Sequence, residues 1–386
     1  MENSAATVDM ISNLPDELLC HILSFLPTKL AFTTTLLSKR WAPLCYSLTA
    51  LRFDDDTVKN VDSFNRFCGF VDKLMLFPSA TNQPIKTFHL KLSRFYKVDH
   101  QSFYAWVEAI KLRRVEELHL LLDNVTLKNL TIFTSRTLVV VKLASLKVEG
   151  ENLCVDLPNL KTLHLRYVSF ETQNNFSKLL KACPILQNLH ASFLLYRRAD
   201  ENNKVEEFKP LFLSKLVRAR FCSTDIPVNL ISNVEFLHIA NAGEALKGFR
   251  FKSIPVFQNL INIQLWFLEF FHGWNGVVDM LQNCPKLQIL FIRKWCSCLS
   301  NEWKCPISVP ECVSSHLRSC TIFNSDGSTN DLAFTTYILQ NTRLLQSMKI
   351  NGTAQSSNGL QKLQIIQELS SCPRMSPECK LSFSFK

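Results

Sequence analysis

Histidine is concentrated in one kind of position along this chain. Five of the nine histidines lie between two apolar residues in a short pattern that recurs from residue 85 onward: His89, His119, His164, His190 and His238. Imidazoles in such positions can act as general bases, bind a metal ion or carry a pH-dependent positive charge. The charge and type of the residues at the neighbouring positions indicate which of these roles is favoured.

Few acidic residues occupy the corresponding and flanking positions of the repeated pattern. Other copies of the pattern place Lys142, Arg220, Gln264, Phe291, Thr321 and Lys349 where these histidines lie, and Glu117 is the main acidic neighbour. The candidate site for a target is therefore a basic and aromatic set: His164, Arg166, His190, Arg218, Arg220, His238 and Trp266. Three interpretations stay open: ordinary polar residues on a solvent-exposed strand, a surface that recognises an acidic or phosphorylated partner, or a histidine metal site. In the second case, we expect binding to tighten modestly from about pH 7.5 to 6 as the histidines gain charge.

The pattern that positions these side chains reads apolar, x, x, apolar, x, apolar. It occurs eleven times, as in 85–90, 115–120, 160–165, 234–239 and 287–292, at spacings of 18 to 30 residues. Alternating apolar residues predict a short strand with one buried face, so the histidine position points to the opposite, concave face. This spacing is typical of leucine-rich repeats. The alternative is a series of unrelated αβ units.

Some of the segments between the strands have helical patterns. Residues 174–182 and 274–283 are examples, and each is followed by a Cys-Pro pair, Cys183-Pro184 and Cys284-Pro285. Proline at this point ends a helix. Because the spacing of the pattern varies, we expect an irregular solenoid.

The segment from Asp9 to Leu51 carries a second motif. It contains Leu14-Pro15-Asp16-Glu17-Leu18-Leu19, apolar residues at helical spacing as far as Pro27, and then Leu37-Ser38-Lys39-Arg40-Trp41. Pro15, Asp16 and Glu17 suit the first turn of a helix. Three helices of this size cannot bury their own apolar residues. The segment strongly resembles an F-box, and the alternative is a plain helical hairpin that caps the next domain.

The F-box resemblance implies a partner. It implies docking on a Skp-type adaptor held by a cullin, and the residues expected at that contact are Leu14, Pro15, Leu18, Ile22, Leu23 and Leu26. Pro43 departs from the pattern, because a proline inside the third helix removes a backbone hydrogen bond. We therefore expect that helix to start late or to bend.

The C-terminal region has its own resemblance. Residues 309–317 and 372–379 look like the opening and the close of the FBD domain of plant F-box/leucine-rich-repeat proteins. Between and after them, the pattern predicts helices over 331–341 and 360–370 and strands over 345–350 and 380–385. We interpret this domain as a cap that shields the last repeat.

Composition excludes several classes of protein. The chain of 386 residues is 47% hydrophobic, so it can form a large core, and its net charge of +10 is spread over its length instead of gathered in one tail. The tightest cysteine cluster, Cys296, Cys298, Cys305 and Cys312, lacks zinc-ligand spacing. Gly-rich phosphate loops and hydrolase motifs are absent. We expect no metal, no cofactor and no catalytic group, in a protein of the cytoplasm or nucleus without a signal peptide or membrane segment.

The predicted fold class is α/β: a three-helix F-box, then an irregular leucine-rich-repeat arc of short parallel strands, then an FBD cap. The predicted boundaries are 9–50 for the F-box, 51–84 for a helical connector, 85–300 for the repeats and 301–386 for the FBD domain. The resemblance implies a substrate-recognition subunit of an SCF-type cullin ubiquitin ligase, with no membrane partner. Two alternatives stay open: a non-degradative interaction scaffold, and a nucleic-acid-binding protein that uses the basic concave face.

Overall fold

The computed structural model shows two compact units. It describes residues 10–11, 13–76, 84–92, 98–128, 131–150, 153–197, 213–222, 231–243, 245–246, 254–268, 271, 273–295, 303–325, 327–352 and 359–385. The first unit comprises Met1–Cys183 and Leu195–Ala199, and the second comprises Pro184–Leu194 and Asp200–Lys386. None of the described helices is long and apolar enough to cross a membrane.

Three short helices open the first unit: α1 (Asp16–Ser24), α2 (Thr28–Thr33) and α3 (Trp41–Tyr46), with a 3₁₀ turn at Thr34–Leu36. Pro15 and Pro27 stand immediately before α1 and α2, where a proline costs no helical hydrogen bond. The third helix starts at Trp41, which leaves Pro43 in its first turn. Backbone N–H groups have no helical partner there, so the proline is tolerated. The expected late start of this helix is confirmed.

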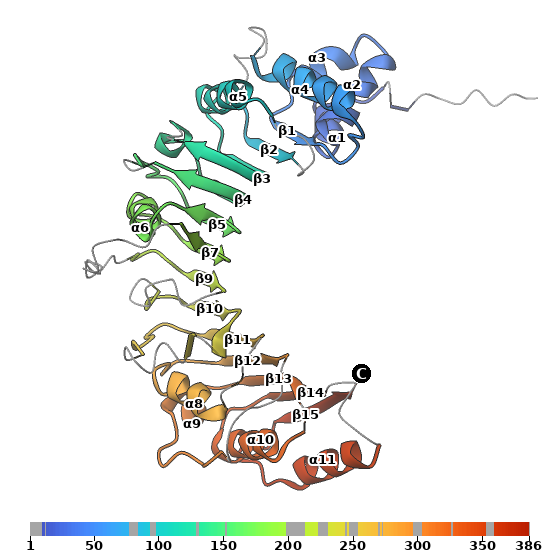
Figure 1. Ribbon diagram of the computed structural model, residues 1–386. Coiled ribbons are helices and arrows are strands. Elements are labelled where there is room, and N and C mark those ends of the chain that lie inside the picture. Colours follow the sequence, from blue (N-terminus) through green and yellow to red (C-terminus); the bar gives the residue numbers. More distant parts are fainter. Residues whose placement is uncertain are drawn as a thin grey trace, which may run out of the picture. The chain divides into compact units, whose positions relative to one another are not determined.

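Parallel strands form the sheet of the first unit. Their order is β1 (Ala50–Asp54), β2 (Thr87–Leu92), β3 (Glu117–Lys128), β4 (Val140–Glu149) and β5 (Thr162–Arg166), and the short β6 (Ser169–Phe170) pairs with both β4 and β8 (Leu195–Tyr196). The other helical segments are α4 (Val61–Leu76), α5 (His100–Leu112), a 3₁₀ turn (Thr131–Thr134) and α6 (Gln173–Lys181). In Figure 1, α5 and α6 lie on one side of these strands.

The second unit repeats this arrangement. Its strand order is β7 (Asn188–Ser192), β9 (Arg218–Phe221), β10 (Phe236–Ile239), β11 (Asn262–Phe267), β12 (Ile289–Lys294), β13 (Ser319–Ser325), β14 (Ser347–Gly352) and β15 (Lys380–Phe385), all parallel. The helices are α8 (Trp274–Gln282), α9 (Glu311–Ser315), α10 (Thr329–Asn341) and α11 (Gly359–Ser371). In both units most strands alternate between buried and partly exposed residues, so one face of each sheet belongs to the core. We call the opposite face the open face.

The strand predictions hold throughout. Each of the eleven copies of the pattern contains a strand that starts two residues into it, as Thr162 does in 160–165, and β15 spans the predicted 380–385. The connector was predicted less well. Residues 51–84 were expected to be a helical connector, and α4 does form a helix at Val61–Leu76. The segment before it differs, because β1 begins at Ala50 and joins the sheet beside β2. Leu51 and Phe53 are buried and alternate with Arg52 and Asp54, which is the pattern of a strand.

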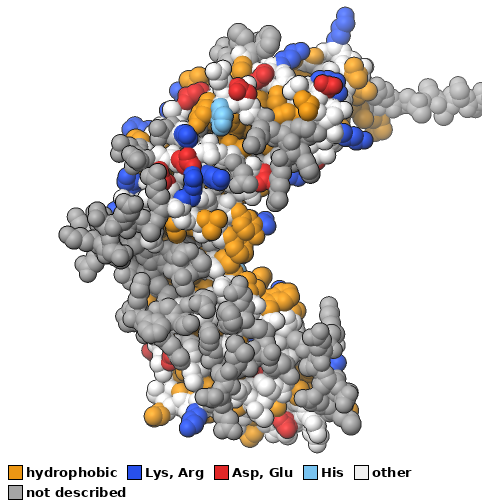
Figure 2. All heavy atoms as spheres, in the orientation of Figure 1, with side chains coloured by type: hydrophobic (Ala, Val, Ile, Leu, Met, Phe, Trp, Pro, Cys, Tyr) orange, Lys and Arg blue, Asp and Glu red, His pale blue; other side chains and the backbone are white. Residues whose placement is uncertain are grey.

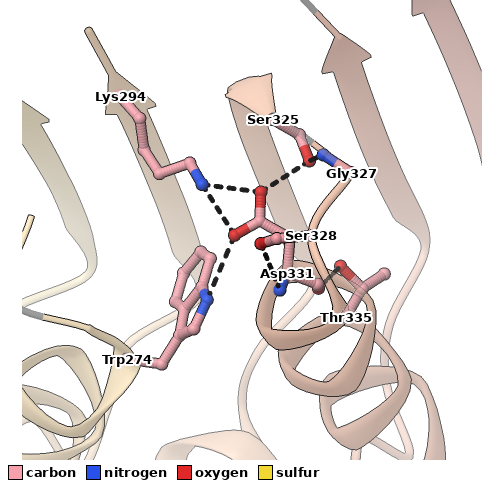
Figure 3. A network of polar contacts seen from close by, with 7 residues as sticks. All are labelled: Trp274, Lys294, Ser325, Gly327, Ser328, Asp331 and Thr335. Carbon is pink, nitrogen blue, oxygen red and sulfur yellow. Dashed lines mark hydrogen bonds and ion pairs between the residues drawn. The ribbon is translucent and has the colours of Figure 1, made fainter. Parts of the chain in front are cut away.

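A buried ion pair lies in the core of the second unit (Figure 3). The Nζ of Lys294, at the end of β12, lies 2.6 Å from both carboxylate oxygens of Asp331 in α10. The Nε1 of Trp274 and the Oγ of Ser325 also donate to this carboxylate, at 3.2 and 2.7 Å. Lys294 and Asp331 are only 1% and 2% exposed. Four hydrogen bonds therefore satisfy a carboxylate that would be costly to bury alone.

Candidate functional site

Helix α1 carries two different apolar faces. Leu19 and Leu23 point into the core, and each is 1% exposed. Leu18, Ile22 and Phe25 share another face, at exposed fractions of 49%, 44% and 67%. Their spacing of four and three residues aligns them along one side of the helix. We call these three residues the α1 stripe.

The six residues predicted for adaptor contact differ in their exposure to solvent. Pro15, Leu18 and Ile22 are exposed, and Leu14 and Leu26 are partly exposed. Leu23 is the exception, because it packs in the core and offers almost no surface to a partner. Its prediction as a contact residue is wrong, since at helical spacing it lies one turn from Leu19 on the buried face.

Sequence reasoning missed other exposed apolar residues in the same three-helix region. Phe25, Leu30, Leu36 and Leu37 are 67%, 53%, 88% and 71% exposed. The helical spacing of Phe25 from Ile22 was a signal for the first of them. Leu36 and Leu37 lie outside a regular helix, so periodicity could not assign them a face.

The open face of the first unit carries a row of basic side chains. Arg52, His89, His119, Lys142 and His164 occupy paired positions on β1 to β5. The rings of His89 and His119 lie 5.7 Å apart. Burial, followed by the charge of Lys142, lowers the pKa of His119 to about 4. Burial also lowers the pKa of His89.

A pocket of about 470 Å³ opens beside this row. Phe25 and Pro27 line it from the end of α1, and Arg52, His89 and His119 line it from the strands. The lining includes carboxylates as well, from Asp54 and Glu117. Its volume falls in the range of small-molecule sites, but its mixture of charges favours no single ligand class.

The open face of the second unit carries a second basic row. His190, Arg220 and His238 occupy paired positions on β7, β9 and β10. Arg220 and Arg218 lie over the ring of Phe236, at 5.0 and 5.7 Å from its centroid. These contacts hold the two guanidinium groups on the sheet surface by cation–π attraction.

His238 is packed against an aromatic side chain. Its ring lies 4.8 Å from that of Trp266, edge to face. Burial, together with the charges of Arg220 and His190, lowers the pKa of His238 to about 4. This histidine is therefore neutral between about pH 6 and 7.5. The expected gain of charge in that range is wrong for His238, because the sequence did not reveal how deeply it packs.

The candidate target residues are divided between the two units. His164 and Arg166 belong to the first, and His190, Arg218, Arg220, His238 and Trp266 belong to the second. Within the second unit, register brings together His190, Arg220 and His238, with Trp266 on the next strand. A role for these seven residues in binding a target stays a prediction.

The described residues contain no group of three or more His, Cys, Asp or Glu arranged to hold a metal ion. In the cysteine cluster, Cys296 and Cys298 lie outside the described residues. Cys312 is buried, and that burial raises the pKa of its thiol to about 12. A protonated buried thiol behaves as a small hydrophobic group.

Comparison with known proteins assigns the parts of the chain. Family models match residues 11–51 as an F-box domain, 103–203 as the LRR repeats of FBD-associated F-box protein At5g56370, and 304–350 as FBD. The FBD-associated F-box protein At4g10400 of Arabidopsis thaliana is 28% identical over 98% of this chain and 100% of its own length. F-box/FBD/LRR-repeat protein At4g00160 of the same plant is 28% identical over 98% of the chain and 94% of its own length.

The chain thus carries F-box, LRR and FBD matches in this order and is similar over nearly its whole length to plant FBD-associated F-box proteins. Helices α1 to α3 and the α1 stripe therefore lie within the F-box. The LRR match spans most of α5 and β3 to β8, and the FBD match spans α9, β13, α10 and most of β14. Asp331 lies in the FBD match and Lys294 lies before it, so the buried ion pair joins the FBD domain to the preceding strand.

Proposed function

We propose that this chain is the substrate-recognition subunit of an SCF-type cullin ubiquitin ligase in the cytoplasm or nucleus. In this proposal the F-box binds a Skp-type adaptor, and the open faces of the repeats bind a target protein. The chain supplies no catalytic group. It accelerates ubiquitin transfer by holding a target close to a charged conjugating enzyme.

The α1 stripe is the observation that carries the proposal. Leu18, Ile22 and Phe25 present large apolar side chains to solvent on one face of the F-box. Leu36 and Leu37 add two more in the same domain. Figure 2 shows hydrophobic side chains on the molecular surface at the end that carries α1. Large apolar side chains exposed together on one helix face are typical of a docking site for another protein.

The proposed adaptor contact uses five of the six residues predicted from the sequence. Leu14, Pro15, Leu18, Ile22 and Leu26 stay in the contact set, and Phe25 joins them. Leu23 supports the helix from the core. Arg40 stabilises the start of α1, because its guanidinium donates to Asp16 at 2.6 Å and to the carbonyl oxygen of Leu14 at 2.6 Å.

Reconstitution with purified components tests the proposal. The full chain is mixed with a Skp-type adaptor, a cullin with its RING subunit, ubiquitin and the activating and conjugating enzymes. We expect the chain to enter the complex and to promote ubiquitin transfer to a captured protein or to itself. A chain that binds the adaptor but never increases ubiquitinated species would favour the non-degradative scaffold. A chain that does not bind the adaptor would contradict both.

A further inference from the structure

The open face of the second unit combines cations and aromatic rings without a carboxylate. Its described strand positions on this side hold the following cationic and aromatic residues: His190, Arg218, Arg220, Phe236, His238, Trp266, Phe291, Arg293, Phe323, Lys349 and Lys380. The other described positions on this side of β7 to β15 are neutral, and none is Asp or Glu. The described strand positions of this face therefore carry positive charge that no acidic residue among them compensates.

Arg293 lies among the aromatic side chains of this face. Register places it between Trp266 on β11 and Phe323 on β13. Its guanidinium carbon lies 5.1 Å from the Trp266 ring centroid, 4.7 Å from that of Phe323 and 4.3 Å from that of Trp295. We call Arg293, Trp266, Trp295 and Phe323 the Arg293 cage.

The cage leaves polar groups without partners. Among the described residues, the Nε of Arg293 and the Nε1 of Trp266 are buried and make no hydrogen bond. Cation–π contacts offset only part of the hydration that a guanidinium loses. A planar guanidinium that is already held in place suits bidentate binding of a carboxylate or phosphate, because little side-chain entropy is left to lose.

The cage and the strand that carries it also offer apolar surface. Trp295 is 55% exposed and Ile289, two positions before Phe291 on β12, is 38% exposed. Aromatic side chains and arginine are the residues that most often dominate protein–protein contacts. A ligand that matches this site carries an acidic group and, next to it, an aromatic or aliphatic side chain.

A nucleic-acid strand fits this face less well. Sites for a single strand combine aromatic rings, on which bases stack, with a positively charged groove that follows the phosphate backbone. This face has the rings, so the comparison depends on how its cations are distributed. Here β11 and β13 carry no Lys or Arg on their open side, so neutral strands separate the cations of β9, β12 and β14. An acidic peptide with spaced charges matches that distribution.

We propose that the Arg293 cage binds an acidic peptide segment in which an aromatic or aliphatic residue adjoins a carboxylate. This inference rests on the proposed function, since it names the class of target segment that the repeats of the second unit hold. The carboxylate pairs with Arg293, and the neighbouring apolar side chain packs on Trp295 and Phe323. His238 supports Trp266 from the adjacent strand.

Three probes test this inference on the full chain: a random copolymer of glutamate and tyrosine, polyglutamate, and oligo(dT). Isothermal titration at fixed salt should show tighter binding of the copolymer than of polyglutamate. Arg293→Gln should weaken copolymer binding roughly tenfold or more. Arg293→Lys keeps the charge but loses the planar stack, so its copolymer affinity should fall between those of the wild type and the glutamine variant.

Lys349→Gln is the matched control, because Lys349 is an exposed cation on the same face outside the cage. It should change copolymer binding by no more than about twofold. Circular dichroism and adaptor binding should be unchanged in all three variants, which separates this inference from the proposed function. Equal affinity for copolymer and polyglutamate, equal loss in Arg293→Gln and Lys349→Gln, or tighter binding of oligo(dT) would each overturn the inference while adaptor binding persists.

Discussion

Lys294 and Asp331 form a buried ion pair in which the ammonium contacts both carboxylate oxygens at 2.6 Å. Their residues come from β12 and α10, 37 positions apart in the chain. The rings of Phe271 and Trp274 lie 5.1 and 5.7 Å from the same ammonium. The pair thus joins α10 to the sheet inside the core of the second unit.

Breaking this pair should strongly destabilise the second unit. Asp331→Ala leaves the ammonium of Lys294 buried without its counter-ion, and we expect a loss of roughly 3 to 5 kcal/mol in unfolding free energy. The double variant Lys294→Met with Asp331→Asn removes both charges and keeps an acceptor for Trp274, so it should lose much less. Thermal unfolding followed by circular dichroism measures both.

An exposed ion pair provides the control. Lys91 and Asp56 lie 2.7 Å apart, but their side chains are 36% and 56% exposed. Asp56→Ala should cost about 1 kcal/mol or less, because water screens that pair. Similar losses in Asp331→Ala and Asp56→Ala would show that burial of the Lys294 pair has no energetic consequence.

Two glycines should respond to alanine in opposite directions. Gly327 has a φ of +69°, and an added Cβ would lie 2.4 Å from the Cδ1 of Ile365. Gly327→Ala should therefore destabilise the protein by about 1 to 3 kcal/mol. Gly69 lies within α4, and a Cβ added there would meet no atom within 4 Å. Gly69→Ala should stabilise the protein by roughly 0.5 to 1 kcal/mol. Urea denaturation of each variant checks the signs, and equal effects would contradict this prediction.

Stability should fall as the pH drops from about 6.5 to 4. Burial holds the pKa of His119 and of His238 at about 4, below the ordinary value of 6.5. The unfolded chain then binds protons first, so this stabilising contribution is complete above pH 6.5 and is lost as the pH falls through that window. The groups that act on His119 are Lys142, His89, His164 and Arg52, and those that act on His238 are Arg220 and His190.

Replacing both histidines tests this linkage. His119→Gln with His238→Gln should lower the dependence of the unfolding midpoint on pH between about 6.5 and 4.5. His100→Gln is the matched control, because His100 is exposed at the start of α5. An unchanged pH dependence in the double variant would contradict the assigned burial effect.

The sequence predicted the repeats well and the chemistry of their surfaces less well. Strands such as β5 and β11 follow from local alternation, because a two-residue period specifies both the strand and its buried face. The burial of Lys294 also had a signal: it follows Leu290 and Ile292 at the same period, which points a lysine into the core. Its partner could not be predicted, since Asp331 approaches from a distant helix.

Other features depend on tertiary packing alone. The spacing of α1 placed Leu18 and Leu23 in one apolar set, and only the packing of α1 against the other F-box helices separates them. The shifted pKa of His238 depends on its burial and on the charges of Arg220 and His190, which come from other strands. Alignment of the repeats pairs the correct positions on neighbouring strands, but it does not show how deeply each side chain packs.

Adaptor affinity of α1-stripe variants tests the central claim most directly. Isothermal titration of a purified Skp-type adaptor into the full chain should show specific binding, and Leu18→Ala with Ile22→Ala should weaken it by roughly a hundredfold. Leu112→Ala is the matched control, since Leu112 is 78% exposed at the end of α5 in the same unit. It should bind the adaptor as the wild type does. Wild-type affinity in the double variant, with its circular dichroism unchanged, would contradict the account of this chain as an F-box receptor docked through the α1 stripe.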